Sequence, residues 1–233
     1  MSAPWLPEWF DAAAPVRREL WRGVEAQHVV ATLRLVDSLH EQEVLEQLLE
    51  DSKPPLPAGA GGLHYLLFTP FRYVSPTPSR FRRAYDKGVF YGADEPATVA
   101  AELAYWRWKF VMDSEALRSR EVVTEHTFFL ARFEGRELDL TAPPWNAHRS
   151  RWRDRTDYSA CHELASHVRE RQAQVQAIRY ESARRESAWC EVVFSPPTLS
   201  MPSPHRQQTW TCKATARTVL WAHGRELLEF PQA

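Results

Sequence analysis

The 233-residue chain lacks the patterns by which metal-dependent and nucleotide-binding enzymes are often recognised. It has no CxxC pair, no HExxH or comparable spacing of metal ligands, and neither a GxGxxG nor a Walker phosphate loop. These absences argue against a metal centre and against a nucleotide held by a glycine-rich loop. Cysteines are few: Cys161, Cys190 and Cys212 are widely spaced and odd in number, so we expect free, buried thiols.

A surplus of charge and a long apolar run are also missing. The 29 basic and 30 acidic residues give a formal net charge of -1, which argues against nucleic-acid binding through bulk charge. No apolar run approaches the ~20 residues of a membrane span, and the N-terminus lacks the apolar core of a signal peptide. We therefore expect a cytoplasmic protein that binds neither nucleic acid nor membrane.

Hydrophobic residues are plentiful: they make up 44% of the chain and include ten tryptophans, enough for a sizeable core. We expect one domain over residues 1–233, with an N-terminal extension or insertion at about residues 1–70. Helices are predicted at residues 38–51, 94–112 and 157–172. Strands are predicted at residues 20–24, 64–68, 88–92, 127–133, 137–140, 175–180, 190–194 and about 209–218. Strands outnumber helices without regular alternation, which favours an α+β domain with a mixed sheet.

Local signals support the first two helices. Ser38 and Glu41 form a capping box, and four apolar residues then follow at helical spacing: Val44, Leu45, Leu48 and Leu49. In the second helix, Asp94 is predicted to cap the start, and Pro96 suits the first turn. Its predicted core-facing stripe is Val99, Leu103, Trp106 and Phe110. Glu102 falls on the shoulder of that stripe, between core and solvent.

Six polar residues are candidates for chemistry, although each also has an ordinary structural interpretation: Arg80, Arg82, Tyr91, Glu102, Ser159 and Ser182. Guanidinium groups bind pyrophosphate through paired hydrogen bonds, and a tyrosine ring offers a face to nicotinamide or adenine. A carboxylate beside a glycosidic bond stabilises an oxocarbenium-like transition state or binds the ribose hydroxyls. If these side chains converge, they could attack the N-glycosidic bond of NAD.

These residues lie in stretches that resemble the RES-domain family, the toxin half of the RES–Xre toxin–antitoxin systems. The resemblance spans roughly residues 20–195. It rests on Leu20-Trp21-Arg22-Gly23, Ser79-Arg80-Phe81, Val89-Phe90-Tyr91-Gly92-Ala93, Val99-Ala100-Ala101-Glu102, Asp157-Tyr158-Ser159-Ala160-Cys161 and Ile178-Arg179-Tyr180-Glu181-Ser182. Ser79 and Phe81 depart from the usual glycine and tryptophan, and a segment of about residues 25–70 separates Arg22 from Arg80. Arg72 is an alternative to Arg22, and Arg82 to Arg80.

The resemblance implies a fold like that of the ADP-ribosyltransferases and an enzyme that takes NAD as substrate, without a further cofactor. Arg80, with Arg22, would hold the phosphates, and Tyr91 would stack against the nicotinamide side. Glu102 would stabilise the ribose cation, and two serines would hydrogen-bond nicotinamide or ribose: Ser159 and Ser182. The acceptor would be water, phosphate or a protein side chain.

The implied partner is an Xre-type helix-turn-helix antitoxin that blocks the cleft, in a hetero-oligomer, and a homodimer is a further possibility. Two other functions stay open from the sequence. One is an ADP-ribosyltransferase that modifies a cellular protein. The other is a non-catalytic module that only pairs with an Xre-type regulator, for which the apolar residues and tryptophans would form an interface.

Overall fold

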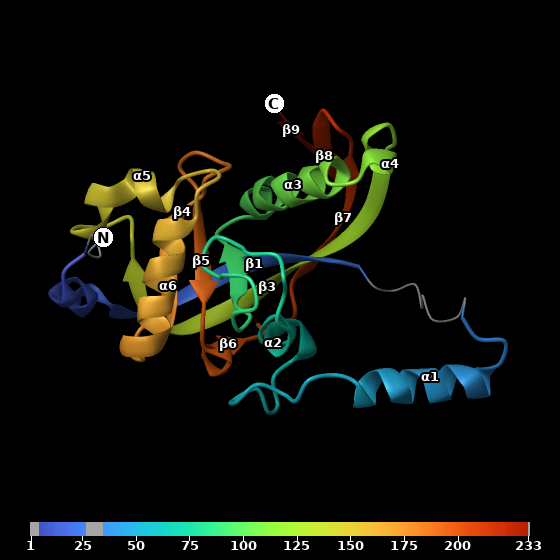
Figure 1. The fold of residues 1–233 in the computed structure, drawn as a ribbon, viewed down its shortest axis with the longest axis horizontal. Coiled ribbons are helices and arrows are strands. Elements are labelled where there is room, and N and C mark those ends of the chain that lie inside the picture. The colour runs from blue at the N-terminus through green and yellow to red at the C-terminus, as the bar shows by residue number, and fades with distance from the viewer. Residues whose placement is uncertain (1–4, 27–34, 233) are drawn as a thin grey trace.

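Residues 5–26 and 35–232 are described by the computed structural model, and their strands form one mixed sheet (Figure 1). The order of the strands is β1–β2–β5–β4–β3–β7–β8–β9, and β6 also pairs with β3. Strands β3 and β4 are parallel, whereas the other pairs are antiparallel. The strand bounds are β1 Ala14–Glu25, β2 Phe90–Ala93, β3 Val122–Asp139, β4 Ala177–Glu181, β5 Trp189–Val193, β6 Leu199–Ser200, β7 Gln207–Ala214, β8 Thr218–His223 and β9 Glu226–Pro231. The predicted α+β class with a mixed sheet is confirmed.

Strand β1 is central to this arrangement because it pairs on both of its sides. It runs antiparallel to β3 over its whole length, from Ala14 opposite Glu137 to Glu25 opposite His126, and its Trp21 lies opposite Ala93 of β2. The pairings β1–β2, β2–β5, β5–β4, β4–β3 and β3–β1 therefore close into a ring. This closure places an N-terminal strand beside β2, which comes much later in the sequence.

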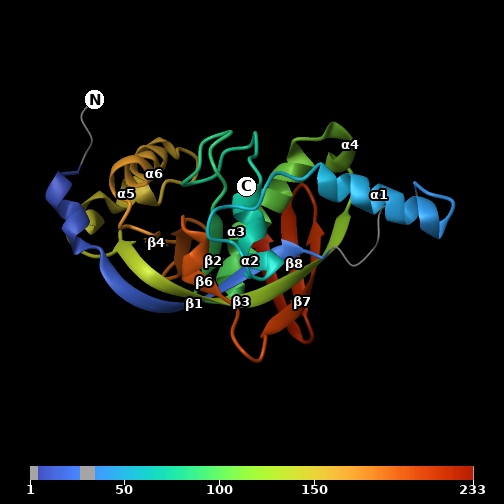
Figure 2. The same ribbon diagram turned by 90° about the horizontal axis from the view of Figure 1, so that it is seen from below.

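Helices cover parts of this sheet. Their bounds are α1 Leu39–Asp51, α2 Tyr65–Arg72, α3 Pro96–Met112, α4 Glu115–Arg118, α5 Arg149–Trp152 and α6 Ser159–Arg171. The three predicted helices correspond to α1, α3 and α6. In Figure 2 the long strands β1 and β3 run as a curved pair on the side away from α5 and α6. None of the described helices is long and apolar enough to cross a membrane.

Two apolar clusters lie within the fold. The larger one contains aromatic side chains that are fully buried, among them Phe81, Phe128, Trp145, Trp210 and Trp221. The smaller one contains Leu20, Leu67, Phe90, Phe129 and Phe133. The three cysteines are buried and free, as predicted. Burial of this apolar surface is the main term that stabilises the sheet.

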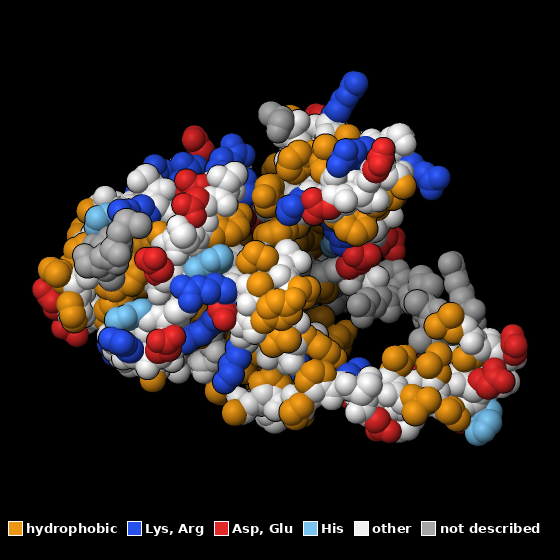
Figure 3. All heavy atoms as spheres, in the orientation of Figure 1, with side chains coloured by type: hydrophobic (Ala, Val, Ile, Leu, Met, Phe, Trp, Pro, Cys, Tyr) orange, Lys and Arg blue, Asp and Glu red, His pale blue; other side chains and the backbone are white. Residues whose placement is uncertain are grey.

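Helix α1 stands apart from these clusters. Its capping box is confirmed, because Ser38 Oγ accepts a hydrogen bond from the Glu41 amide at 3.2 Å. Its predicted apolar face is largely exposed, however, with Val44, Leu48 and Leu49 all in contact with solvent. Figure 3 shows hydrophobic side chains along α1 and over α2. Residues 27–34 of the predicted insertion at 25–70 lie outside the described residues.

The predicted strand at residues 64–68 is wrong, since this stretch begins helix α2. The side chain of His64 caps the helix by accepting a hydrogen bond from the Leu66 amide at 3.3 Å, and Leu67 is buried in the smaller cluster. A short apolar run has no periodicity that separates a strand from a buried helical turn. The strand boundaries also needed correction: 127–133 and 137–140 belong to the single strand β3, and 209–218 spans β7 and the start of β8.

The predicted core face of α3 is only partly right, because Val99 is buried and Leu103 packs against the larger cluster, but the rest of the stripe does not face the core. Its small residues face the core, because Ala100, Ala101 and Ala104 are buried whereas Phe110 is 54% exposed. The N-cap residue is Glu95 and not Asp94, whose carboxylate instead accepts a hydrogen bond from the Thr98 hydroxyl at 3.0 Å. Small side chains bring the helix close to the sheet, and the two largest residues of the predicted stripe, Trp106 and Phe110, are left at its side.

Two acidic residues of the sheet are buried, Glu137 on β3 and Glu191 on β5. Arg18 donates two hydrogen bonds to Glu137, at 3.1 and 2.9 Å. Glu191 of β5 is fully buried, and no N–H or O–H group of the described residues donates a hydrogen bond to its carboxylate oxygens. Burial, reinforced by the neighbouring charge of Glu137, raises the pKa of Glu191 well above its usual value. The folded protein therefore favours a protonated Glu191.

This pKa shift gives a prediction for Glu191→Gln. The carboxyl ionises near pH 4.5 in the unfolded chain, whereas folding holds its proton to higher pH, so the wild type loses stability as the pH rises above that value. Glutamine does not titrate, so the variant should be more stable than the wild type at pH 7.5, with the gain disappearing towards pH 4.5. Urea unfolding at both pH values measures this. The exposed Glu134→Gln is the control, and a gain independent of pH would contradict the assignment.

Candidate active site

A cavity of about 360 Å³ lies between helix α3, strands β1 and β2 and the loop at residues 75–82. Its volume is within the range of small-molecule sites. The lining residues come from elements far apart in the sequence: Trp21, Arg22, Gly23, Ser75, Thr77, Pro78, Ser79, Arg80, Arg82, Tyr91, Gly92, Ala93, Val99, Glu102, Leu103, Trp106, Tyr158, Tyr180 and Cys190. The wall is thus rich in aromatic rings and contains arginines and one carboxylate.

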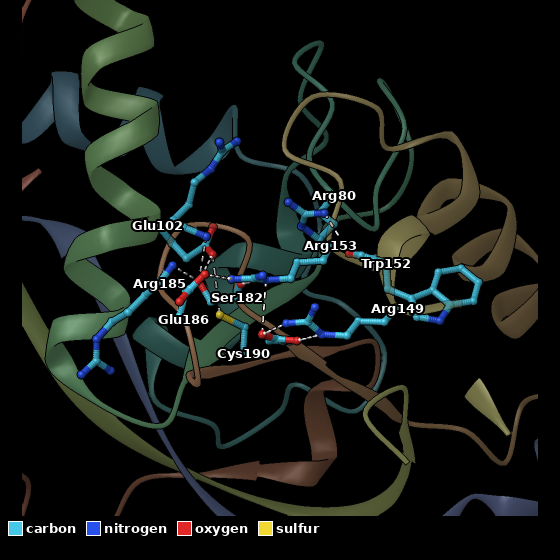
Figure 4. A network of polar contacts seen from close by, with 11 residues as sticks. Arg80, Glu102, Arg149, Trp152, Arg153, Ser182, Arg185, Glu186 and Cys190 are labelled. Atoms are coloured by element: carbon cyan, nitrogen blue, oxygen red, sulfur yellow. Dashed lines mark hydrogen bonds and ion pairs between the residues drawn. The ribbon is translucent and has the colours of Figure 1, made fainter. Parts of the chain in front are cut away.

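Arg80 is 6% exposed and is held rigidly in this wall. Its Nη1 donates hydrogen bonds to the carbonyls of Trp152 at 2.9 Å and Asp154 at 2.7 Å, and its guanidinium lies 4.7 Å from the centre of the Tyr158 ring. Figure 4 shows Arg80 beside Trp152. Within the described part of the chain, no carboxylate forms an ion pair with Arg80, whose hydrogen bonds to protein carbonyls come from Nη1. The guanidinium is therefore oriented, and its charge is available to an anion.

Arg22 enters the same wall from β1. Its Nη1 donates to the Tyr91 carbonyl at 2.9 Å, and its guanidinium lies 4.8 Å from the centre of the Phe90 ring. Its buried Nε has no hydrogen-bond partner among the described residues. Burial lowers the pKa of Arg22 to about 10, so it still carries its charge at neutral pH. A buried, charged donor without a partner is costly, which is a feature of sites that receive a ligand.

Glu102 projects from α3 and is fixed by Ser182. The Ser182 hydroxyl donates to Glu102 Oε1 at 2.6 Å and accepts hydrogen bonds from the amides of Arg184 at 3.1 Å and Arg185 at 3.0 Å. Because these amides occupy its lone pairs, the hydroxyl proton is directed to Glu102. The Sγ of Cys190 lies 4.0 Å from the same oxygen. Figure 4 shows Glu102, Ser182 and Cys190 meeting between α3 and the loop that follows β4.

Tyr91 supports the turn that carries Arg80. Its hydroxyl oxygen accepts a hydrogen bond from the Phe81 amide at 2.8 Å and lies 3.0 Å from Ser79 Oγ. The turn itself is closed by two backbone hydrogen bonds between Ser79 and Arg82, of 2.8 and 3.1 Å. Burial raises the pKa of Tyr91 to about 12, so the phenol is neutral at physiological pH. The ring lines the cavity while the hydroxyl has a structural role.

The structure brings most of the predicted site residues together. Arg22, Arg80, Tyr91 and Glu102 line one cavity, and the fully buried Ser182 lies directly behind Glu102. Ser159 does not line the cavity: it is exposed, and its amide donates to the Asp157 carboxylate at 2.8 Å. The predicted contact of Ser159 with nicotinamide or ribose therefore finds no support in this geometry.

The two alternative arginines are used elsewhere. Arg72 does not line the cavity, and it donates to the Pro54 carbonyl at 2.5 Å and lies 3.6 Å from the Glu50 carboxylate. Arg82 lines the cavity, but its guanidinium donates to the carbonyls of Ser75, Thr77 and Arg83 and so holds the loop. The geometry thus favours Arg22 and Arg80 as the cations open to a ligand.

Sequence reasoning missed several aromatic residues of the cavity, namely Trp21, Trp106, Tyr158 and Tyr180. Tyr158 immediately precedes Ser159 in the quoted motif, and the tyrosine lines the cavity whereas the serine does not. Trp106 was assigned to the core face of its helix. The described residues contain no group of three or more side chains that could hold a metal ion.

The role of the Tyr91 hydroxyl predicts the effect of Tyr91→Phe. The change leaves the Phe81 amide without its hydrogen-bond acceptor next to the buried turn, so we expect a loss of ~1–2 kcal/mol in the free energy of unfolding. Chemical denaturation measures the loss. Tyr85→Phe removes the same atom from a tyrosine that is 72% exposed, and equal losses in the two variants would contradict the role.

Comparison with known proteins agrees with the resemblance noted in the sequence. A family model described as the RES domain matches residues 56–215, a stretch that contains Arg80, Glu102 and Ser182, whereas Arg22 precedes it. The search of curated proteins finds no match. A solved structure with a similar fold is the crystal structure of the M. tuberculosis MbcT–MbcA toxin–antitoxin complex. It has 14% sequence identity and a TM-score of 0.50, and the match covers 90% of this chain and 91% of that one. Because the family model matches more than half of the chain, the protein belongs to the RES-domain family.

Proposed function

We propose that this protein is the toxin of a toxin–antitoxin system and that it consumes NAD by cleaving the nicotinamide–ribose bond. The observation that carries the proposal is the meeting, in one cavity, of two guanidinium groups without carboxylate partners and one oriented carboxylate. Arg22 and Arg80 supply the positive charge that a pyrophosphate requires. Glu102 supplies negative charge where a ribose cation develops. Family membership and the fold shared with a toxin–antitoxin chain support the same assignment.

In the proposed reaction the bond between ribose C1′ and nicotinamide N1 breaks. Its electron pair leaves with nicotinamide, which becomes neutral, and positive charge develops on the ribose. The carboxylate of Glu102 stabilises that charge. This stabilisation is stronger because the Ser182 hydroxyl holds the carboxylate in place before the reaction. Water or phosphate then bonds to C1′, and water releases a proton when it does so. NAD is the substrate, and the proposal requires no other cofactor.

The aromatic wall completes the binding site. Tyr91, Tyr158 and Trp106 offer ring faces for the nicotinamide and adenine. The arginines are rigid before the ligand arrives, since each is hydrogen-bonded to backbone carbonyls and lies against a ring: Arg22 against Phe90, and Arg80 against Tyr158. Binding therefore costs little side-chain entropy. The regulator that we propose is an Xre-type antitoxin that binds over this cavity and blocks it. Both proteins would act in the cytoplasm.

The central test of the mechanism is Glu102→Gln. The variant keeps the shape of the side chain but removes its charge, so NAD consumption should fall by ~10²-fold or more. Release of free nicotinamide by the purified protein, without antitoxin, measures the rate. Glu115→Gln, in the exposed helix α4, is the matched control and should retain full activity.

Three outcomes would overturn parts of the proposal. An unchanged rate in Glu102→Gln would exclude the role of that carboxylate. NAD that stays intact after long incubation with the antitoxin-free wild type would favour a non-catalytic pairing module. Label from NAD that accumulates on a protein would identify an ADP-ribosyltransferase.

A second prediction separates Arg22 from Arg72. Arg22→Gln removes a cavity cation, so the KM for NAD should rise about tenfold or more, the size expected for one charge-assisted hydrogen bond. Arg72→Gln removes the same charge outside the cavity and should leave KM unchanged. Steady-state kinetics, with thermal unfolding to establish that both variants are folded, measures the difference. A rise in KM for Arg72→Gln alone would show that the phosphates bind elsewhere.

A further inference from the structure

A second cavity, of about 320 Å³, lies against the loop at residues 182–187 and is lined mainly by arginines. Arg149, Arg153, Arg155 and Arg184 contribute to its wall together with Ser150 and Glu186. Three of these arginines come from the α5 segment and the turn after it. In Figure 4, Arg149 and Arg153 extend from that segment towards the loop that carries Ser182 and Glu186. None of the residues that line this cavity belongs to the lining of the proposed NAD cavity.

The arginines outnumber the acids available to them. Arg149 binds Glu181 through two hydrogen bonds of 2.5 Å, and Arg153 lies 3.3 Å from the same carboxylate. Glu186 reaches Arg153 only at 4.0 Å. Arg155 forms no ion pair within the described part of the chain. Four guanidinium groups therefore share two carboxylates, and two positive charges are left uncompensated.

Arg184 is held in a fixed position although no acidic side chain in the described part of the chain pairs with it. Its Nη2 donates to the Arg155 carbonyl at 2.6 Å and to the Tyr158 hydroxyl at 3.3 Å, and its guanidinium lies 3.7 Å from the centre of the Tyr105 ring. No carboxylate of the described residues pairs with it. A guanidinium that is held in place by a ring and a carbonyl keeps its charge for a ligand and loses little entropy when the ligand binds.

We propose that this arginine cavity binds the phosphate group of a small anion, either inorganic phosphate or a phosphate monoester. Forked guanidinium donors match tetrahedral phosphate oxygens, and the Ser150 hydroxyl adds a neutral donor. No aromatic ring lines this cavity, so it offers nothing on which a base could stack. The ligand is thus recognised through its phosphate alone, unlike the dinucleotide of the proposed active site.

The position of the site connects it to Glu102. Arg153 Nε donates to the Ser182 carbonyl at 2.9 Å, and the Ser182 hydroxyl holds Glu102 at 2.6 Å. Arg184 contacts Tyr158, which lines the other cavity. A phosphate bound here contacts the residues that position the loop behind the carboxylate. The inference goes beyond the proposed NAD cleavage, and its test does not depend on that activity.

Binding of inorganic phosphate, and separately of AMP, can be titrated by calorimetry into the full-length protein without NAD. A constant ionic strength in chloride keeps general screening equal between samples. Arg155→Gln removes an unpaired cation of the cavity and should weaken phosphate binding about tenfold. Arg151→Gln is the matched control: it removes the same charge from helix α5, just before Arg155 in the chain, but outside the cavity, so its binding should equal that of the wild type.

The remaining variant locates the ligand. Arg22→Gln removes a cation of the NAD cavity and should leave phosphate binding intact. Phosphate binding that is lost in Arg22→Gln but kept in Arg155→Gln would overturn the proposal. Equal phosphate binding by Arg155→Gln and Arg151→Gln would also overturn it, as would the absence of saturable phosphate binding to the wild type. If the binding of AMP depends on Arg155, the ligand is a phosphate monoester. If only the binding of inorganic phosphate depends on Arg155, the ligand is the free ion.

Discussion

Tyr91 connects the two cations on which the candidate active site depends. Its carbonyl accepts a hydrogen bond from Arg22, and its hydroxyl accepts one from the backbone of the turn that carries Arg80. The short strand β2 therefore sets the positions of both arginines at once. Glu102 follows on the next helix, so β2 and α3 together determine the distance between positive and negative charge in the cavity.

The cavity keeps its charges apart instead of pairing them. Glu102 is held by the Ser182 hydroxyl and not by an arginine, and Arg80 is held by carbonyl groups. Unpaired buried charge lowers stability, and contacts with rings offset only part of that cost. The rest is offset by the closed ring of strands and by the two apolar clusters. Such local instability within a well-packed fold is typical of a site that awaits a charged ligand.

Several features were predictable because they depend on neighbouring residues. The capping box at Ser38, the helix around Glu102 and the strand that ends near Tyr91 all follow from local patterns, and the structure contains each of them. The failures occurred where packing decides. The run from residue 64 to 68 is helical, with Leu67 packed into the smaller cluster, and α3 turns its alanines to the core, where only small side chains let it pack close to the sheet. The smaller cluster and the sheet are formed by residues elsewhere in the chain, so the local sequence of these segments does not predict either contact.

The sequence by itself determined which side chains could carry the chemistry and placed Arg80, Tyr91 and Glu102 within one short span. That proximity is local, since a turn, a strand and a helix follow one another without interruption. Tertiary structure decided the rest. Pairing of β1 with both β2 and β3 brought Arg22 into the cavity in place of Arg72, and the loop after β4 put Ser182 behind Glu102. These contacts join residues far apart in the chain, and such pairing is set by strand register and packing, which no local pattern encodes.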